Sequence, residues 1–267
     1  MSQFKGVVDT LFIPLTARIY VSKKFPEYFF DAKAVELEKA LPDETILKKS
    51  SEYSMIASAA RYYNMDKMVL EFAEKHGPCN VVYLGCGLET ACYRLKNIKA
   101  KFFEVDLPEV IEKRRCFLGE SENEILIGGD LFALDWVGQI DTTLPTITLA
   151  SGVFMYFHKE KIMKFISELQ EVFGQLVLVF DATDEDGIKF TNRYVKRTGN
   201  KDAMMYFFVN DGNQFAKELN DVKLIEERLF FIDARKILKN KTGLYSRIAM
   251  RICDKKRRAF ILHLKLC

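Results

Sequence analysis

From residue 81 onward, short and largely apolar runs alternate with segments that carry apolar residues at helical spacing. Runs of four or five such residues are typical of strands whose two faces are both buried. A parallel connection needs a crossover long enough to hold a helix, so this alternation predicts a doubly wound α/β fold with a mostly parallel sheet. The runs are VVYL (81–84), FFEV (102–105), ILIG (125–128), TITLA (146–150) and LVLVF (176–180).

Helices are predicted between these runs and before them. Apolar periodicity and capping residues place them at about 51–75, 159–173 and 185–196, with a further helix capped by Asp31 and another that begins at Pro108. Two late strands, 224–232 and 260–266, would form an antiparallel edge. We expect an N-terminal helical cover over residues 1–76 and an α/β domain over 77–267, together forming one compact unit.

Composition narrows the classes of partner. Lys and Arg number 40 against 37 Asp and Glu, so the net charge of +3 is weaker than that of a dedicated nucleic-acid binder. No apolar stretch approaches the roughly 18 residues of a membrane-spanning helix, and no signal peptide is recognisable, so a cytoplasmic protein without a membrane partner is expected. The six cysteines contain no CxxC pair and only three histidines occur, so no metal site is predicted.

The segment LGCGLET (84–90) follows the first strand directly. Gly85 and Gly87 allow a sharp turn and a close approach of the backbone to a ligand. A helix starting at about Thr90 would point its positive end at that ligand. Asp106 ends the second strand, 19 residues after Gly87, where a carboxylate can accept hydrogen bonds from both hydroxyls of a ribose. The pattern predicts a nucleoside cofactor site, the alternative being a tight turn without a ligand.

The kind of nucleoside depends on the residue three positions after the second glycine. The dinucleotide fingerprint has Gly or Ala there, whereas this chain has Thr90. A bulkier side chain hinders a pyrophosphate at the helix start, but S-adenosylmethionine has no phosphate. The position therefore favours S-adenosylmethionine over NAD, and a NAD-linked oxidoreductase remains a third hypothesis.

Several segments resemble the bacterial branch of the leucine carboxyl methyltransferase family, which acts on polyketide-like molecules. The resemblance implies a class I methyltransferase fold, with a seven-stranded sheet covered on both faces and an N-terminal helical cover. It runs from about residue 10 to 180. The segments that carry it are TLFIPLTARIY (10–20), AARYYNMD (59–66), LGCGLETACYRL (84–95), FFEVDLPEVIEKRR (102–115), GGDLFALDW (128–136) and GVFMYF (152–157).

The resemblance also implies roles for single residues. Arg61 would hold the carboxylate of the methionine moiety, and Arg18 is a weaker candidate for a second contact with it. Asp106 would bind the ribose hydroxyls, although Glu104 lies on the same strand face and could compete for that role. The remaining cofactor contacts would be Gly85 and Gly87 at the methionine and ribose, Asp130 at the adenine amino group and Leu131 beside the base.

One departure from the family concerns Ser151, where Glu is common. Serine at this cofactor-binding position can still form a hydrogen bond, but it brings no negative charge close to the sulfonium and amino groups of the cofactor. This loss keeps a degenerate cofactor-binding protein without transferase activity open as the alternative hypothesis.

The sequence favours an S-adenosylmethionine-dependent O-methyltransferase that yields S-adenosylhomocysteine and acts on a carboxylate or hydroxyl of a small-molecule acceptor. A carboxylate acceptor needs no base, whereas a phenol would benefit from one. We assign no catalytic residue, and His158 is only a candidate. Tyr20, Tyr156 and Tyr206 are weak candidates for the wall of the acceptor pocket.

Overall fold

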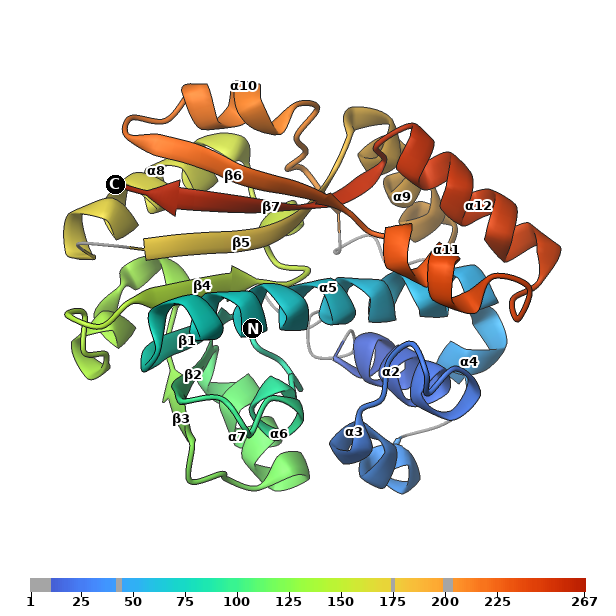
Figure 1. The fold of residues 1–267 in the computed structure, drawn as a ribbon, viewed down its shortest axis with the longest axis horizontal. Coiled ribbons are helices and arrows are strands. Elements are labelled where there is room, and N and C mark those ends of the chain that lie inside the picture. The colour runs from blue at the N-terminus through green and yellow to red at the C-terminus, as the bar shows by residue number, and fades with distance from the viewer. Residues whose placement is uncertain (1–10, 42–44, 174–175, 199–203) are drawn as a thin grey trace.

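Seven strands form a single sheet in the order β3-β2-β1-β4-β5-β7-β6, with helices on both faces (Figure 1). The computed structural model describes residues 11–41, 45–173, 176–198 and 204–267. Strands β1 to β5 are parallel, and β7 runs antiparallel to both of its neighbours, β5 and β6. The strands are β1 (Cys79–Leu84), β2 (Ala100–Asp106), β3 (Glu124–Gly128), β4 (Thr146–Ala150), β5 (Leu176–Thr183), β6 (Val222–Leu229) and β7 (Ala259–Leu266).

The predicted doubly wound fold and its antiparallel edge are confirmed. Each of the five apolar runs lies within one of the parallel strands, and the two late strands form the edge. The sixth strand is shorter than predicted because the chain turns after Leu229 and a helix begins at Ile232.

Most predicted helices occur at the expected places. The helix over 51–75 is α5, which Ser51 caps by accepting a hydrogen bond from the backbone N–H of Ser54, and Pro108 opens α7. The helices are α2 (Phe12–Lys24), α3 (Ala32–Glu36), α4 (Thr45–Lys49), α5 (Glu52–His76), α6 (Ala91–Arg94), α7 (Pro108–Leu118), α8 (Lys159–Val172), α9 (Glu185–Thr198), α10 (Gly212–Lys217), α11 (Ile232–Leu238) and α12 (Leu244–Lys255). Short 3₁₀ segments are η1 (Leu37–Ala40), η2 (Leu131–Ala133), η3 (Asp135–Gln139) and η4 (Phe154–Tyr156).

The helix expected after the glycine loop is reduced to one turn. α6 has only four residues, and the side chain of Thr90 does not cap it. Thr90 instead donates its hydroxyl to a carboxylate oxygen of Asp31, which is fully buried. The helix therefore begins where it was predicted, but its single turn contributes only a weak dipole field at a ligand.

Two apolar clusters cover the two faces of the sheet. On one face the core joins α5 and α2 to β1, β4 and β7, and on the other it joins α8 and α10 to the same strands and their neighbours. The long helix α5 lies over the sheet, α2 packs on α5, and α3 lies next to α2 and α6 (Figure 1). Residues before and after position 76 thus share one core. Within the described ranges, no helix is both long and apolar enough to cross a membrane.

Candidate functional site

The glycine loop leaves β1 at the carboxyl edge of the sheet. The backbone N–H groups of Gly85 and Cys86 both donate to the carbonyl oxygen of Val105 on β2, so the loop folds back across the neighbouring strand. Gly85 has a φ of 63°, and a Cβ there would lie 2.5 Å from Cγ2 of Val153. Both the backbone conformation and this close approach require glycine. The loop is thus held against the segment that follows β4.

Asp106 lies at the end of β2, beside this loop. Its two carboxylate oxygens accept hydrogen bonds from the backbone N–H groups of Gly87 and Leu107, each at 2.8 Å. Burial raises the pKa of Asp106, and the two N–H groups oppose that rise. A carboxylate oxygen has more than one lone pair, so Asp106 can accept further hydrogen bonds from a ligand while the loop holds it in place.

At the ends of β4 and β5, Arg61 and Asp181 meet. Nη1 of Arg61, on α5, lies 3.2 Å from Oδ2 of Asp181, and Oδ1 of Asp181 accepts a 2.6 Å hydrogen bond from the backbone N–H of Gly152. Gly152 has a φ of 72°, and a Cβ there would lie 2.6 Å from Nη1 of Arg61. The side chain of Arg61 is 14% exposed and that of Asp181 6%. Arg61 and Asp181 therefore lie on one side of the site at the carboxyl edge of the sheet, and Asp106 lies on the other side.

Two polar atoms in this region have no partner among the described residues. Nε of Arg61 and Oγ of Ser151 are both buried and form no hydrogen bond. Burial alone would lower the pKa of Arg61, but the carboxylate of Asp181 outweighs it and raises that pKa. Each of the two unpartnered atoms could form a hydrogen bond with a ligand, although buried atoms of this kind also occur away from the site, at Nε of Arg18 and of Arg114.

Arg18 lies behind the glycine loop, where other residues of the protein bind its guanidinium. Its guanidinium donates to a carboxylate oxygen of Asp31 at 2.9 Å, to the carbonyl oxygen of Leu88 and to the hydroxyl of Thr90. The side chain is 1% exposed. The structure therefore contradicts the weak assignment of Arg18 to a cofactor carboxylate, because both terminal nitrogens already hold the loop to the N-terminal helices.

Arg94 completes this buried ionic cluster. Its guanidinium forms two hydrogen bonds to Asp66, of 2.7 and 2.8 Å, and a third to Asp31 at 3.0 Å. Burial alone would raise the pKa of Asp31, but Arg94 and Arg18 outweigh it and lower that pKa. The cluster ties α3 and α5 to the segment that carries the glycine loop.

Glu104 does not compete with Asp106 for a ribose. It is fully buried and lies 3.3 Å from Nη2 of Arg114, which also donates to Glu124 at 2.8 Å. Nη1 of Arg114 donates to the carbonyl oxygens of Gly87 and Glu89, so this group supports the glycine loop from inside. Burial raises the pKa of Glu104 to about 8. Donor atoms of Cys92, Glu104 and Glu124 lie within 4.8 Å of one another, but Arg114 already supplies the positive charge there.

The predicted adenine contacts lie at the end of β3. Asp130 is exposed and its carboxylate caps η2 by accepting a hydrogen bond from the backbone N–H of Phe132. Leu131 is half-buried, and its carbonyl oxygen accepts a hydrogen bond from the indole of Trp136 at 2.9 Å. Both residues follow β3, which pairs with β2, the strand that ends in Asp106. They therefore lie at the same edge of the sheet as Asp106.

The candidate acceptor residues divide into two groups. The rings of His158 and Tyr206 lie 4.4 Å apart, and the backbone N–H of Tyr206 donates to Met155 in η4, the segment that contains Tyr156. Burial raises the pKa of the Tyr156 hydroxyl, Arg61 lowers it and Asp181 raises it again. Tyr20 lies on α2 and accepts a hydrogen bond from Lys24 at 2.8 Å. The structure thus joins Tyr156, His158 and Tyr206 and separates Tyr20 from them.

Sequence reasoning missed Asp181. It opens an acidic run from 181 to 186, and no role was predicted for it from the sequence. The available signal was its place as the first polar residue after the apolar run of the fifth strand. In a parallel sheet that position meets the ends of the other strands, where ligands bind.

The sheet order and the site at its carboxyl edge define the class I methyltransferase fold. The model of the leucine carboxyl methyltransferase family matches residues 14–170, and the chain belongs to this family. The predicted resemblance is thereby confirmed.

Individual proteins agree with this assignment. The tetracenomycin polyketide synthesis O-methyltransferase TcmP of Streptomyces glaucescens is 25% identical over 155 residues, which are 58% of this chain and 57% of that relative. The chain thus matches just over half the length of this curated relative.

Two solved structures share the fold over nearly the whole chain. A DUF574 family protein of Streptomyces avermitilis has a TM-score of 0.60 at 14% identity and covers 94% of this chain and 97% of its own. Magnesium protoporphyrin IX methyltransferase (ChlM) of Synechocystis, solved with S-adenosylhomocysteine bound, has a TM-score of 0.51 at 13% identity. The match covers 96% of this chain and all of that one.

Proposed function

We propose that the protein is an S-adenosylmethionine-dependent O-methyltransferase that acts on a small-molecule acceptor. The observation that carries the proposal is the convergence of four groups at the carboxyl edge of one sheet. They are the glycine loop, Asp106, Ser151 with its unpartnered hydroxyl, and the pair of Arg61 and Asp181. Membership of the leucine carboxyl methyltransferase family supports the same reaction.

The residues of the site match the chemical groups of S-adenosylmethionine. Asp106 keeps free lone pairs for the ribose hydroxyls, and the guanidinium of Arg61 has an unpartnered Nε that could donate to the carboxylate of the methionine moiety. Oγ of Ser151 is a buried hydroxyl that no other described residue satisfies, which suits a hydrogen bond to the amino group. Asp130 and Leu131 would meet the adenine at the end of β3.

Asp181 would supply the negative charge that Ser151 does not bring to the site. Its carboxylate is close to Gly152, the residue after Ser151, and therefore brings a negative charge to the end of β4. That charge would attract both the amino group and the sulfonium of the cofactor. The departure from the family at position 151 is thus compatible with cofactor binding.

The bound cofactor supplies an activated methyl group on a sulfonium, whose thioether leaves readily. The chain's own contribution is alignment, since holding two reactants in line removes much of the barrier to a displacement. A carboxylate acceptor arrives ionised and needs no base. Tyr156 keeps its proton at neutral pH because burial raises its pKa, so it would orient an acceptor by donating a hydrogen bond.

The acceptor would lie beside η4, where Tyr156, His158 and Tyr206 come together. These rings suit a flat, aromatic molecule, and the relative TcmP takes its name from polyketide synthesis. A hydroxyl of a polyketide-like acceptor would need a base, and His158 is the imidazole nearest to Tyr206.

Thermal unfolding with S-adenosylhomocysteine, NADH or no ligand tests the proposal. A ligand at about 100 times its dissociation constant adds roughly 2.7 kcal/mol to the free energy of unfolding, which is a shift of several degrees. A shift with S-adenosylhomocysteine alone supports the proposal, and transfer of a labelled methyl group to phenolic and carboxylic acceptors then tests the activity. A shift with NADH alone, or with neither ligand, contradicts it. Binding without transfer to any acceptor would favour the degenerate protein.

A further inference from the structure

Exposed apolar side chains gather on the hairpin formed by α11 and α12. This hairpin connects β6 to β7. It lies beyond the end of the sheet at which Phe260 of β7 pairs with Ala182 of β5 and Leu229 of β6. Five of its apolar side chains are between 47% and 69% exposed, out of twelve exposed large apolar side chains among the described residues. A group of this kind usually marks an interaction surface. The residues are Ile232, Leu244, Tyr245, Ile248 and Ile252.

The apolar side chains of α12 form a stripe that faces away from the protein. At 100° per residue, Leu244, Tyr245, Ile248 and Ile252 lie within about 100° of one another. The buried residues of the same helix, Ser246, Met250 and Cys253, lie on the opposite side. The helix therefore buries a face of mixed polarity and presents its apolar stripe outward, the reverse of an ordinary surface helix.

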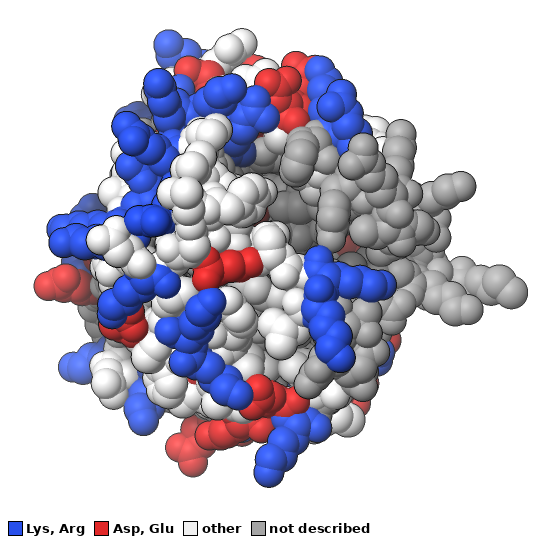
Figure 2. All heavy atoms as spheres, turned by 90° about the vertical axis from the view of Figure 1, so that its right-hand side faces the viewer, with Lys and Arg blue, Asp and Glu red and all other residues white. Residues whose placement is uncertain are grey.

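Cations border the stripe. Arg247 and Arg251 lie along one side of it, and Lys255 continues it at the last turn of the helix. The single acid of α12, Asp254, is 4% exposed and paired with Arg235. The exposed surface of α12 thus carries positive charge only. Figure 2 shows this side of the molecule, where Lys and Arg side chains gather at the left of the view around uncharged side chains.

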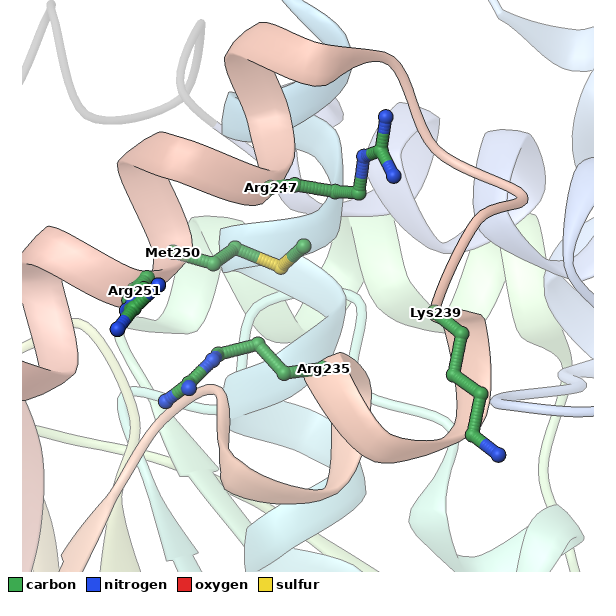
Figure 3. Close-up of a pocket in the computed structure, with 5 residues that line it drawn as sticks. All are labelled: Arg235, Lys239, Arg247, Met250 and Arg251. Carbon is green, nitrogen blue, oxygen red and sulfur yellow. The ribbon is translucent and has the colours of Figure 1, made fainter.

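A small pocket lies between the two helices and is lined almost wholly by cations. Its volume is about 120 Å³, and Figure 3 shows Arg235 extending from α11 toward α12, with Met250 between the helices. Nε of Arg247 is buried there without a hydrogen-bond partner among the described residues. The charged ends of the lining side chains point in different directions, and Arg235 is already paired with Asp254, so they give the hairpin a positive rim and do not enclose an anion. The lining residues are Arg235, Lys239, Arg247, Met250 and Arg251.

The charges narrow the class of partner. A second copy related by a two-fold axis would bring two positively charged α12 surfaces, each with Arg247 and Arg251, into one interface, which is unfavourable. An uncharged apolar partner would leave these cations uncompensated at the rim. An anionic lipid bilayer satisfies both features, since its phosphates pair with the cations and its acyl region accepts the stripe.

Whereas the absence of a spanning segment led us to expect no membrane partner, we propose that the α11–α12 hairpin docks the protein on anionic membrane surfaces. The stripe of Leu244, Tyr245, Ile248 and Ile252 would enter the boundary between headgroups and acyl chains, and the cations of α12 would pair with headgroup phosphates. The helix would lie in the plane of the interface without spanning the bilayer.

Sedimentation with lipid vesicles tests the proposal. Vesicles of phosphatidylcholine with about 30% phosphatidylglycerol should bind the protein at low salt, and vesicles of phosphatidylcholine alone should bind it at least about tenfold more weakly. Raising NaCl from about 0.05 to about 0.5 M should weaken the binding, because surface charges are screened. Failure to bind anionic vesicles at low salt would overturn the proposal.

Paired variants separate the two parts of the surface. The double variant Leu244→Ser and Ile248→Ser should reduce binding to anionic vesicles about tenfold or more. The double variant Arg251→Gln and Lys255→Gln should reduce it by a similar factor. Controls lie elsewhere: Val172→Ser on α8 removes an apolar side chain that is 40% exposed, and Lys164→Gln with Lys113→Gln removes two other surface charges. Equal losses in the controls would overturn the proposal.

Two soluble probes distinguish a bilayer from other anions. Inorganic phosphate should release the protein from vesicles no better than NaCl of equal ionic strength, since bilayer binding involves the stripe as well. The protein should bind poly-glutamate more weakly than it binds anionic vesicles. Ile248→Ser should leave the binding to poly-glutamate unchanged. Selective release by phosphate would point to a free-phosphate site, and equal binding to poly-glutamate would point to an acidic protein partner, so either result would overturn the proposal.

Discussion

Nη1 of Arg61 and Oδ2 of Asp181 lie 3.2 Å apart, although 120 residues separate them in the sequence. The contact joins α5, which covers the sheet, to the end of β5. Asp181 also binds the backbone N–H of Gly152, so one carboxylate fixes both a guanidinium and the turn after β4. The pair thus connects the N-terminal helices to the edge of the sheet where we place the cofactor.

Asp181→Asn should destabilise the protein and weaken cofactor binding together. An asparagine oxygen can still accept from Gly152, but the buried guanidinium of Arg61 would lose its counter-charge, which typically costs about 3 kcal/mol. We expect urea unfolding to show a loss of that order. Calorimetric titration should show a dissociation constant for S-adenosylhomocysteine raised about tenfold or more.

The matched control for this change is Asp186→Asn. Asp186 also pairs with an arginine, Arg258, but its side chain is 66% exposed. Exposed pairs contribute little, so the control should alter stability by less than about 1 kcal/mol and leave ligand affinity unchanged. Equal effects of the two substitutions would contradict the role given to Asp181.

Ser151→Ala should separate ligand binding from stability. Oγ of Ser151 is buried and has no hydrogen-bond partner among the described residues, so its removal should change the free energy of unfolding by less than about 0.5 kcal/mol. A lost hydrogen bond to the cofactor would raise the dissociation constant of S-adenosylhomocysteine about threefold to tenfold. An unchanged dissociation constant would remove Ser151 from the site.

The sequence predicts the sheet well because each strand is specified locally. Apolar runs of the right length stand between helical segments, and the turn residues Gly85 and Pro108 mark strand ends and helix starts. Asp106 was predicted from its distance to the glycine loop, and the structure places it against Gly87. Such features need only short-range information, and one glycine loop with one acid defines a recognisable pattern.

The remaining features depend on contacts that no local pattern contains. Arg18 and Thr90 are 72 residues apart, and only the assembled fold shows that they bind each other. Alternation places Glu104 and Asp106 on one strand face, but Arg114 comes from the next helix to pair with Glu104. Asp181 looks like any acid after a strand until α5 brings Arg61 to it.

Arg18→Met should lower stability with little effect on ligand affinity. The substitution leaves the buried Asp31 with one fewer counter-charge, and breaking such a pair typically costs about 3 kcal/mol. Binding of S-adenosylhomocysteine well below the unfolding temperature should stay within about threefold of the unchanged protein, because Arg18 lies behind the loop.

The control for Arg18 is Arg115→Met on α7, whose side chain is 42% exposed. It should change the free energy of unfolding by less than about 1 kcal/mol. A tenfold loss of ligand affinity in Arg18→Met, with stability retained, would restore the assignment of Arg18 to the cofactor.

Glu104→Gln should change how stability depends on pH. Burial raises the pKa of Glu104 to about 8 in the folded protein, well above its value in an unfolded chain, so folding takes up a proton between these two values. The contribution of Glu104 to the free energy of unfolding is therefore fully present at low pH and is lost as the pH rises toward 8. Glutamine cannot ionise, and Arg114 keeps its 2.8 Å contact with Glu124.

The stability of Glu104→Gln relative to the unchanged protein should consequently rise between about pH 5 and pH 8.5, by roughly 1–3 kcal/mol. Urea unfolding at several pH values measures this difference. Glu112→Gln, at a side chain that is 69% exposed, should show no such trend. A difference between Glu104→Gln and the unchanged protein that stays constant across this range would mean that Glu104 is already ionised at pH 5. In that case its pairing with Arg114 would outweigh its burial.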